Sequence, residues 1–442
     1  MRRPSTRSPA RSQSRARRSE PATETVANVR IDAIAAGGDG VGRIDGMVCF
    51  VPRSAPGDVA HVAYVPHARY ARGRLLQVLE PSARRVAPTC RHYEADRCGG
   101  CQLQHLSGDA QRAARQHMVR DALQRVGHRE VLLPELVSGA EWGYRERLTL
   151  ALRPRGSGWI GGLHAFDDAG RVFALDECPI AHPRLLTCWT AVRGLLRGLP
   201  VPHPESPLRL SLRLTGSSGD QVAVVVRGGS QWSEGAQWAS RIRTADPGVS
   251  AVWWEREGSS AVQLAGEPEP DVLAFAQVNP GVAGALRDHV RAIIRTLAPS
   301  SMIDAYCGRG ELAESVARDG VCVTAIEADA VATTRATERL APWASCRVIT
   351  GMVEDVLEAA LPADLVVLNP PRRGVDIRAT AMLANAAMRG VRAIVYVSCD
   401  PATLARDLSR LPRWRIDSLR CFDMFPQTAH VETVCVLIPE ES

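Results

Sequence analysis

One thiol at the end of an apolar run is the residue in this chain best placed to do chemistry. Cys399 follows Val395–Ser398 and precedes Asp400–Pro401, where the sequence predicts the start of a helix. The free amide groups and the positive dipole end of a helix favour a thiolate over a thiol, and the thiolate is the nucleophilic form. An inert buried cysteine has the same local pattern, so the other motifs decide between the two interpretations.

A glycine turn after another apolar run predicts a cofactor site. Met302–Ala305 is expected to be a strand, and Gly308 and Gly310 form a Gly-x-Gly turn that leads into a helix. The next strand is expected to end at Glu327, where a carboxylate suits a ribose diol. Ala313 stands in place of the third glycine of a pyrophosphate-binding turn, which points away from a dinucleotide and towards S-adenosylmethionine.

A third apolar run ends at Asn369, which Pro370–Pro371 follows. Ligands of parallel sheets bind beyond the carboxyl ends of the strands, so Asn369 is expected to face the cofactor site. Enzymes that methylate exocyclic amines also carry Asn-Pro-Pro, but they place an aromatic residue next. This chain has Arg372 there, which argues against that activity.

A carboxylate near the C-terminus completes a possible reaction. Glu432 lies at the start of the last expected strand, within His430–Val431–Glu432. Carbon 5 of a pyrimidine is a poor nucleophile, but a thiolate that adds to carbon 6 creates an enolate whose carbon 5 can attack a sulfonium methyl group. A carboxylate can then remove the carbon 5 proton. Cys399 and Glu432 together are the minimal set for this methylation.

Four cysteines form a candidate metal site. Cys90, Cys98 and Cys101 lie close together in the sequence, and Cys178 stands far downstream before a proline. Four thiolates suit zinc or an iron–sulfur cluster. Zinc ribbons usually supply two Cys-x-x-Cys pairs, whereas here the fourth cysteine stands alone. A 4Fe–4S cluster is therefore expected ahead of zinc.

The pattern of elements predicts three folded parts. Residues 25–82 hold five short strands with glycine turns, as in a small OB-like β-barrel that binds RNA. Residues 83–270 are expected to form an α+β central domain that carries the cysteines. Residues 271–442 alternate strands and helices, which predicts an α/β fold with a parallel, doubly wound, Rossmann-like methyltransferase sheet.

Charge and composition bound the remaining possibilities. The net charge of +6 equals that of residues 1–20 alone, and all 54 basic residues are arginine. Residues 1–24 are therefore expected to be a disordered basic tail with non-specific phosphate affinity. No apolar run has the length of a membrane span, and the eight other cysteines are scattered singly, as in a reducing compartment. A cytoplasmic location and no membrane partner are expected.

Over residues 25–442 the chain resembles the RNA 5-methyluridine methyltransferases of the TrmA/RumA type. Residues 29–82 look like a TRAM domain, with Gly37–Gly38 and Gly40 in its characteristic turn. Cys399 matches the family nucleophile within Ser-Cys-Asp-Pro-x-Thr-Leu-x-Arg-Asp, and Glu432 matches the base within His-Val-Glu. These two motifs carry the resemblance, because a Gly-x-Gly turn alone is common.

The resemblance also implies ligand-binding residues. The family's donor-binding positions fall on Gln277, Tyr306, Glu327 and Asn369, and its cluster ligands fall on Cys90, Cys98, Cys101 and Cys178. The Asn-Pro-Pro-Arg-Arg-Gly form resembles a ribosomal-RNA subgroup. The implied substrate is 23S rRNA first and tRNA second, and the implied cluster role is structural because the reaction transfers no electrons.

Two further functions remain open at this point. A cytosine C5 methyltransferase would use the same chemistry, but such enzymes usually carry a Pro-Cys motif after the fourth strand, and Asn369–Pro371 has no cysteine. A non-catalytic RNA-binding iron–sulfur protein would keep its phenotype after Cys399→Ala. A monomer is expected in either case.

Overall fold

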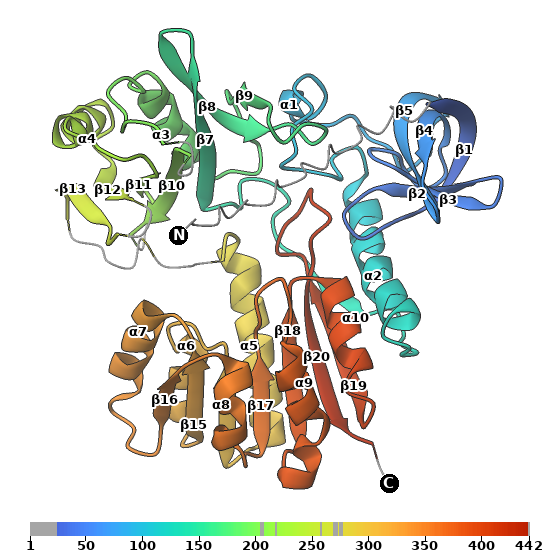
Figure 1. The fold of residues 1–442 in the computed structure, drawn as a ribbon, viewed down its shortest axis with the longest axis vertical. Coiled ribbons are helices and arrows are strands. Elements are labelled where there is room, and N and C mark those ends of the chain that lie inside the picture. The colour runs from blue at the N-terminus through green and yellow to red at the C-terminus, as the bar shows by residue number, and fades with distance from the viewer. Residues whose placement is uncertain are drawn as a thin grey trace, which may run out of the picture.

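The structure is a computed structural model that describes residues 24–203, 207–216, 219–256, 259–267, 273 and 277–440. The predicted basic tail lies almost wholly outside these residues. Figure 1 shows three parts: a barrel (blue), a central part (green) and a C-terminal part (yellow to red). Among the described residues, no helix combines the length and the apolar character that a membrane crossing needs.

The N-terminal part is a closed five-stranded barrel, as the sequence predicts. Alternation of buried and exposed residues along its strands places Val29, Ile31 and Val62 inside. At Gly42 a Cβ atom would lie 2.4 Å from the Arg30 carbonyl oxygen, so only glycine fits where these strands cross closely. In barrel order the strands are β1 (Thr25–Ile34), β2 (Gly40–Ile44), β3 (Met47–Val51), β5 (Tyr70–Glu80) and β4 (Val59–Pro66).

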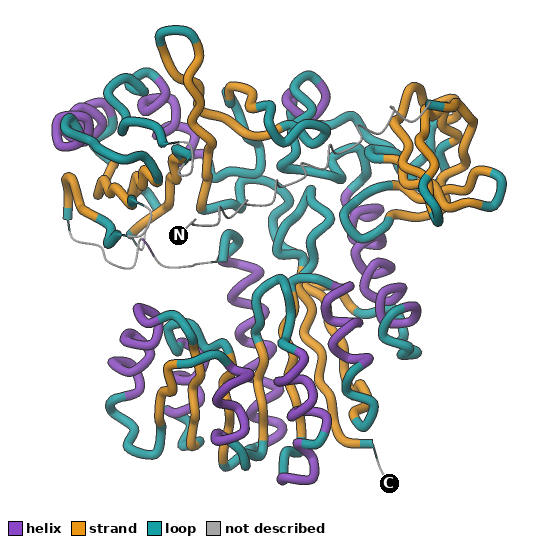
Figure 2. The backbone as a smooth tube through the Cα atoms, in the orientation of Figure 1, coloured by secondary structure: helices purple, strands orange, loops and turns teal. Residues whose placement is uncertain are grey.

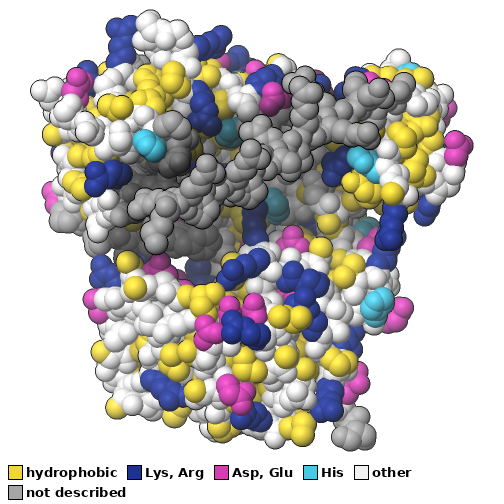
Figure 3. Space-filling view, viewed as in Figure 1, with side chains coloured by type: hydrophobic (Ala, Val, Ile, Leu, Met, Phe, Trp, Pro, Cys, Tyr) yellow, Lys and Arg dark blue, Asp and Glu magenta, His cyan; other side chains and the backbone are white. Residues whose placement is uncertain are grey.

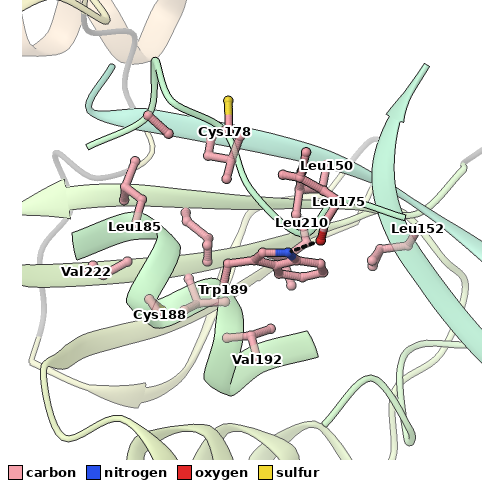
Figure 4. Close-up of a cluster of buried hydrophobic side chains, with 14 of the residues drawn as sticks. Leu150, Leu152, Leu175, Cys178, Leu185, Cys188, Trp189, Val192, Leu210 and Val222 are labelled. Atoms are coloured by element: carbon pink, nitrogen blue, oxygen red, sulfur yellow. Dashed lines mark hydrogen bonds between the residues drawn. The ribbon is translucent and has the colours of Figure 1, made fainter. Parts of the chain in front are cut away.

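The central part is a seven-stranded sheet with helices on one face. Its core surrounds Trp189, whose indole N–H donates to the Leu175 carbonyl at 2.8 Å, and Cys178 lies at the edge of this core (Figure 4). In sheet order the strands are β13 (Val262–Gly266), β12 (Val249–Glu255), β11 (Gln221–Arg227), β10 (Arg209–Thr215), β7 (Arg147–Arg155), β8 (Gly158–His164) and β9 (Val172–Ala174). The helices are α3 (Pro183–Arg193) and α4 (Gly235–Ala245).

The glycine-rich strand β8 was not predicted, and the packing explains its composition. Glycine weakens strand propensity, which hides β8 in the sequence. At Gly161 a Cβ atom would lie 2.4 Å from the Trp189 ring, and at Gly162 it would overlap the Phe173 carbonyl. The core tryptophan and the next strand therefore require glycine at these positions.

The C-terminal part is an eight-stranded sheet between two layers of helices (Figure 2). In sheet order the strands are β16 (Arg347–Thr350), β15 (Cys322–Glu327), β14 (Ser301–Ala305), β17 (Leu365–Leu368), β18 (Ala393–Ser398), β20 (Glu432–Pro439), β19 (Trp414–Phe422) and β6 (Glu135–Val137). The helices are α5 (Pro280–Leu297), α6 (Glu311–Ala317), α7 (Ala330–Leu340), α8 (Val353–Ala360), α9 (Ile377–Ala384), the 3-10 helix η2 (Ala386–Arg389) and α10 (Pro401–Ser409). The predicted Rossmann-like α/β fold is confirmed.

The sheet is not parallel throughout, which corrects the sequence-based expectation. Strands β14 to β18 are parallel, but β20 runs antiparallel between β18 and β19. Only the nine residues 423–431 join β19 to β20. A parallel crossover needs a dozen or more residues, so this short connection forces an antiparallel hairpin.

The segment between the barrel and the central sheet also reaches the C-terminal sheet. It contains α1 (Arg91–Glu94) and the long helix α2 (Gly108–Arg125), which packs against α10. Strand β6 follows and pairs in parallel with β19. The predicted central domain 83–270 therefore contributes a strand to the C-terminal sheet, and its domain boundaries stay a prediction.

Candidate active site

Five predicted site residues meet at one edge of the C-terminal sheet. Tyr306, Glu327, Asn369 and Cys399 lie at the carboxyl ends of β14, β15, β17 and β18. Glu432 begins β20, and because β20 runs antiparallel its start lies at the same edge. This is where ligands of doubly wound sheets bind. Figure 1 shows this edge facing the central part and the barrel.

The turn after β14 is open on one side and closely packed on the other. Tyr306, Gly308 and Gly310 have φ angles of 64°, 56° and 76°, which only glycine adopts without strain. A Cβ atom at Gly308 would meet nothing within 4 Å, whereas one at Gly310 would lie 3.1 Å from the Ala336 Cβ. The turn is therefore held against α7 and presents bare backbone to an open space. Tyr306 also lines a pocket of about 310 Å³.

Glu327 is held in place by backbone amides. Its carboxylate accepts hydrogen bonds from Gly308 N–H at 3.1 Å, Ala328 N–H at 2.7 Å and Asp329 N–H at 2.9 Å. The bond from Gly308 joins the end of β15 to the glycine turn. The predicted ribose-binding carboxylate is thus beside the predicted cofactor turn.

Asn369 and Gln277 both lie near this edge of the sheet. The backbone N–H of Asn369 donates to the Ala305 carbonyl at 3.3 Å, and the side chain of Asn369 is exposed. Gln277 lies three residues before α5, whose N-terminus is at this edge because α5 leads through a short turn into β14. Their roles in cofactor binding stay predictions.

Asp304 is a residue that the sequence analysis missed. It is 2% exposed, and its Oδ2 atom has no hydrogen-bond partner among the described residues. Burial raises its pKa to about 7, an effect that the nearby Glu327 increases. A lone acid inside the apolar run 302–305 was the available signal, since buried acids are rare without a function.

The strand register brings Cys399 and Glu432 together. Ser398 pairs with Thr433 at the end of the β18–β20 ladder, and Cys399 and Glu432 are the next residues of the two segments. The Glu432 carboxylate lies near enough to raise the pKa of the Cys399 thiol. Glu432 is 5% exposed, and burial raises its pKa to about 7, which suits a base at neutral pH.

The predicted thiolate character of Cys399 is wrong for the protein without substrate. Burial raises the pKa of this thiol, and the nearby Glu432 carboxylate raises it further. The helix dipole does not compensate, because Asp400 caps α10 by accepting the Thr403 N–H at 2.8 Å and Pro401 has no N–H to offer.

Arg372 is the second residue that the sequence analysis missed. Its charge lowers the pKa of both Cys399 and Glu432 and so favours their reactive forms. Its side chain is exposed, and no described carboxylate forms an ion pair with it. The available signal was a cation four residues after the end of β17, at the edge where Cys399 and Glu432 lie.

We expect the rate of 5-methyluridine release to fall as the pH drops below about 7, because a protonated Glu432 cannot take the carbon 5 proton. Arg372→Gln should move the midpoint to higher pH, since it removes the charge that lowers the pKa of Glu432 and Cys399. Single-turnover rates of 5-methyluridine release, taken from about pH 6 to about pH 9, measure this midpoint. The matched control is Arg373→Gln. An Arg372→Gln midpoint equal to that of the wild type would refute the assignment.

The four predicted cluster cysteines share one buried space. Each is between 6% and 8% exposed, namely Cys90, Cys98, Cys101 and Cys178. Burial raises the pKa of Cys101 to about 12 and of Cys178 to about 11, and the other thiols of the group raise both further. Among the described residues, however, no three Cys, His, Asp or Glu side chains are arranged to hold one metal ion. The thiols are therefore neighbours but do not form a compact single-ion site.

The known proteins that this chain resembles include RNA methyltransferases. The model of a family described as tRNA (uracil-5-)-methyltransferase matches residues 352–440. An uncharacterised RNA methyltransferase of Thermosynechococcus vestitus is 32% identical over 92% of this chain and 97% of that protein. The 23S rRNA (uracil(1939)-C(5))-methyltransferase RlmD of Thiobacillus denitrificans is 32% identical over 90% of this chain and 96% of that protein.

A solved structure shares the whole fold. The tRNA (uracil-54, C5)-methyltransferase of Pyrococcus abyssi, in complex with S-adenosyl-L-homocysteine, has a TM-score of 0.67 and 23% identity. The match covers 93% of this chain and 100% of the other. The barrel, the central part and the methyltransferase-like sheet thus occur together in another protein.

Proposed function

The chain belongs to a family of S-adenosylmethionine-dependent RNA uracil-C5 methyltransferases, and we propose that it methylates a uracil of 23S rRNA by covalent catalysis through Cys399. The observation that carries the mechanism is that the ends of β18 and β20 bring Cys399 and Glu432 close enough to interact. The relatives' activity supports an enzyme, and it favours uracil over the cytosine alternative.

The proposed reaction uses Cys399 first as nucleophile and then as leaving group. The Cys399 sulfur bonds to carbon 6 of uracil, and the electrons of the C5=C6 bond move to carbon 5, which attacks the methyl group and breaks its bond to sulfur. Glu432 then takes the carbon 5 proton. The electrons of that C–H bond re-form C5=C6 and expel the Cys399 thiolate. The charge of Arg372 lowers the pKa of both groups.

S-adenosylmethionine supplies an activated methyl group on a sulfonium, and the residues around the glycine turn fit its binding. The open space beside Gly308 lets the donor approach backbone closely. Glu327, already fixed by three amides, is placed for the ribose hydroxyls. Gln277, Tyr306 and Asn369 complete the proposed set.

The barrel surface supports an RNA substrate. Tyr70 contacts Phe50 edge-on at 5.8 Å and stacks on His67 at 4.8 Å. Arg69 and Arg72 lie beside them with exposed side chains. Aromatic rings that can stack on bases, together with arginines that contact phosphates, are typical of single-stranded RNA binding. Figure 3 shows further arginines (dark blue) where the C-terminal part borders the other parts.

A ribosomal RNA is favoured over tRNA because RlmD of Thiobacillus denitrificans is more similar in sequence than the Pyrococcus abyssi tRNA enzyme. Nucleoside mass spectrometry of rRNA and tRNA from a deletion strain tests this choice. Loss of 5-methyluridine from 23S rRNA supports the proposal. Loss from tRNA alone would identify the alternative substrate. The cytoplasmic location and the monomeric state stay predictions from the sequence.

We propose that the four buried cysteines hold a 4Fe–4S cluster rather than zinc. Zinc ribbons usually supply two Cys-x-x-Cys pairs, whereas Cys178 stands alone in the sequence before a proline. Cys90, Cys98, Cys101 and Cys178 would hold the cluster, which would stabilise thiolates that burial otherwise disfavours.

We expect protein purified without oxygen to contain iron and sulfide, and Cys101→Ser to lose both. The matched control is Cys322→Ser, which changes an exposed cysteine on β15. Elemental analysis and the visible absorption spectrum measure the cluster. Stoichiometric zinc without iron in the wild type would contradict this assignment.

A further inference from the structure

The loop that leads to Glu432 is tied to the segment that carries the cysteines. Residues 423–431 join β19 to β20 and contain no helix or strand. Figure 1 shows this loop (red) rising from the top of the sheet towards the central part. At its first residue, Asp423 forms an ion pair with Arg115 of α2 at 3.2 Å, and both side chains are almost fully buried.

Gln427, at the centre of the loop, forms hydrogen bonds through both its backbone and its side chain. Its carbonyl accepts the N–H groups of Gln102 and Leu103 at 3.1 and 3.0 Å. Gln111 of α2 accepts the Gln427 N–H through Oε1 at 3.1 Å and donates from Nε2 to the Gln427 Oε1 at 2.8 Å. Gln427 is 2% exposed and has a φ of 71°, so this strained conformation depends on its partners.

The contacts continue along the loop towards Glu432. The Arg115 Nε donates to the Thr428 carbonyl at 3.1 Å, and the Ala429 N–H donates to the Gln102 Oε1 at 3.3 Å. A Cβ atom at Gly38 of the barrel would lie 2.7 Å from the Gln102 Cβ and 3.1 Å from the Ala429 Cβ. The barrel, the residues after Cys101 and the loop therefore pack against one another at one place.

We propose that Gln111, with the amides of Gln102 and Leu103, positions Glu432 for proton removal by fixing the loop 423–431. The proposal rests on the proposed role of Glu432 as the base. Gln111 is then a positioning residue, because it touches neither substrate nor cofactor. Gln102 and Leu103, which follow Cys101, then assist the reaction by holding the loop, and this requires no electron transfer.

Gln111 should affect one step only, the removal of the carbon 5 proton. Addition of Cys399 to carbon 6 and methyl transfer come before proton removal, so they should not depend on the exact place of Glu432. Uracil with fluorine at carbon 5 separates these steps, because no proton is left there and the covalent adduct with Cys399 cannot be resolved. Adduct formation on such RNA reports the early steps, and turnover on ordinary RNA reports all of them.

The test compares the full-length wild type with Gln111→Ala and Gln427→Asn. Asparagine tolerates a positive φ, but its shorter side chain cannot reach Gln111. Both variants should form the adduct on 5-fluorouridine RNA within about twofold of the wild-type rate, while turnover on ordinary RNA falls about 10- to 100-fold. The control is Gln116→Ala, which removes a glutamine of the same helix that bonds to the Pro134 carbonyl instead.

The outcomes separate the two proposals. Failure of the wild type to form any adduct would refute the covalent mechanism itself. Normal turnover in both variants would overturn the positioning role of Gln111. An equal fall in adduct formation and in turnover would also overturn it, because a general loss of structure slows the early and the late steps alike. Normal adduct formation with slow turnover, and build-up of a methylated adduct on ordinary RNA, is the result that supports the inference.

Discussion

Replacement of Cys399 with alanine is expected to lower the methylation rate by about 10⁴-fold or more, because the variant has no atom to bond to carbon 6. The reaction at carbon 5 depends on that bond for its electrons, and binding alone cannot replace it. The measurement is transfer of a labelled methyl group to RNA under single-turnover conditions. RNA affinity should stay near that of the wild type, since the side chain is small and partly buried.

The control for this experiment is Cys322→Ala. Cys322 is an exposed cysteine at the start of β15, at the opposite edge of the sheet from the proposed site. This variant should keep the wild-type rate. Turnover by Cys399→Ala at a rate near that of Cys322→Ala would show that another group provides the electrons, and the covalent mechanism would then be wrong.

Glu432→Gln is expected to stop the reaction at a later point. Glutamine has nearly the same shape but cannot accept a proton, so turnover should fall by about 10²- to 10⁴-fold. Cys399 can still add to carbon 6 and the methyl group can still be transferred. A methylated protein–RNA adduct should therefore accumulate on ordinary RNA, where it appears as a slow band on a denaturing gel.

The matched control is Glu440→Gln, which changes an exposed glutamate just beyond the other end of β20. It should neither slow turnover nor trap an adduct. Slow turnover of Glu432→Gln without any adduct would move Glu432 from proton removal to an earlier step. The adduct is thus the signature that distinguishes a base from a group that only supports the site.

Local patterns in the sequence were enough to predict the fold class and to place the candidate reactive residues at the ends of strands. The apolar runs before Tyr306, Asn369 and Cys399 predicted strands that end at one edge of a sheet, and the structure confirms those strands. The short barrel strands were visible through their glycine turns. Each of these signals depends on neighbours in the chain, which is why sequence reasoning could find them.

Features that depend on distant contacts were not predictable in this way. The antiparallel direction of β20 follows from the short loop 423–431, and the pairing of Gln427 with Gln111 joins residues 316 positions apart. The helix position of Cys399 predicted a lowered pKa, but burial and the nearby Glu432 raise the pKa of this thiol, and Asp400 caps the helix. Helix position alone cannot give a pKa when the side chains across the site are unknown.

The central claim is that Cys399 and Glu432 make 5-methyluridine in RNA. The most direct measurement incubates purified protein with unmodified rRNA or tRNA and S-adenosylmethionine that carries a deuterated methyl group, followed by nucleoside mass spectrometry. We predict deuterated 5-methyluridine with the wild type, in 23S rRNA, and none with Cys399→Ala. Deuterium in another nucleoside, or the same 5-methyluridine signal with Cys399→Ala, would contradict this account.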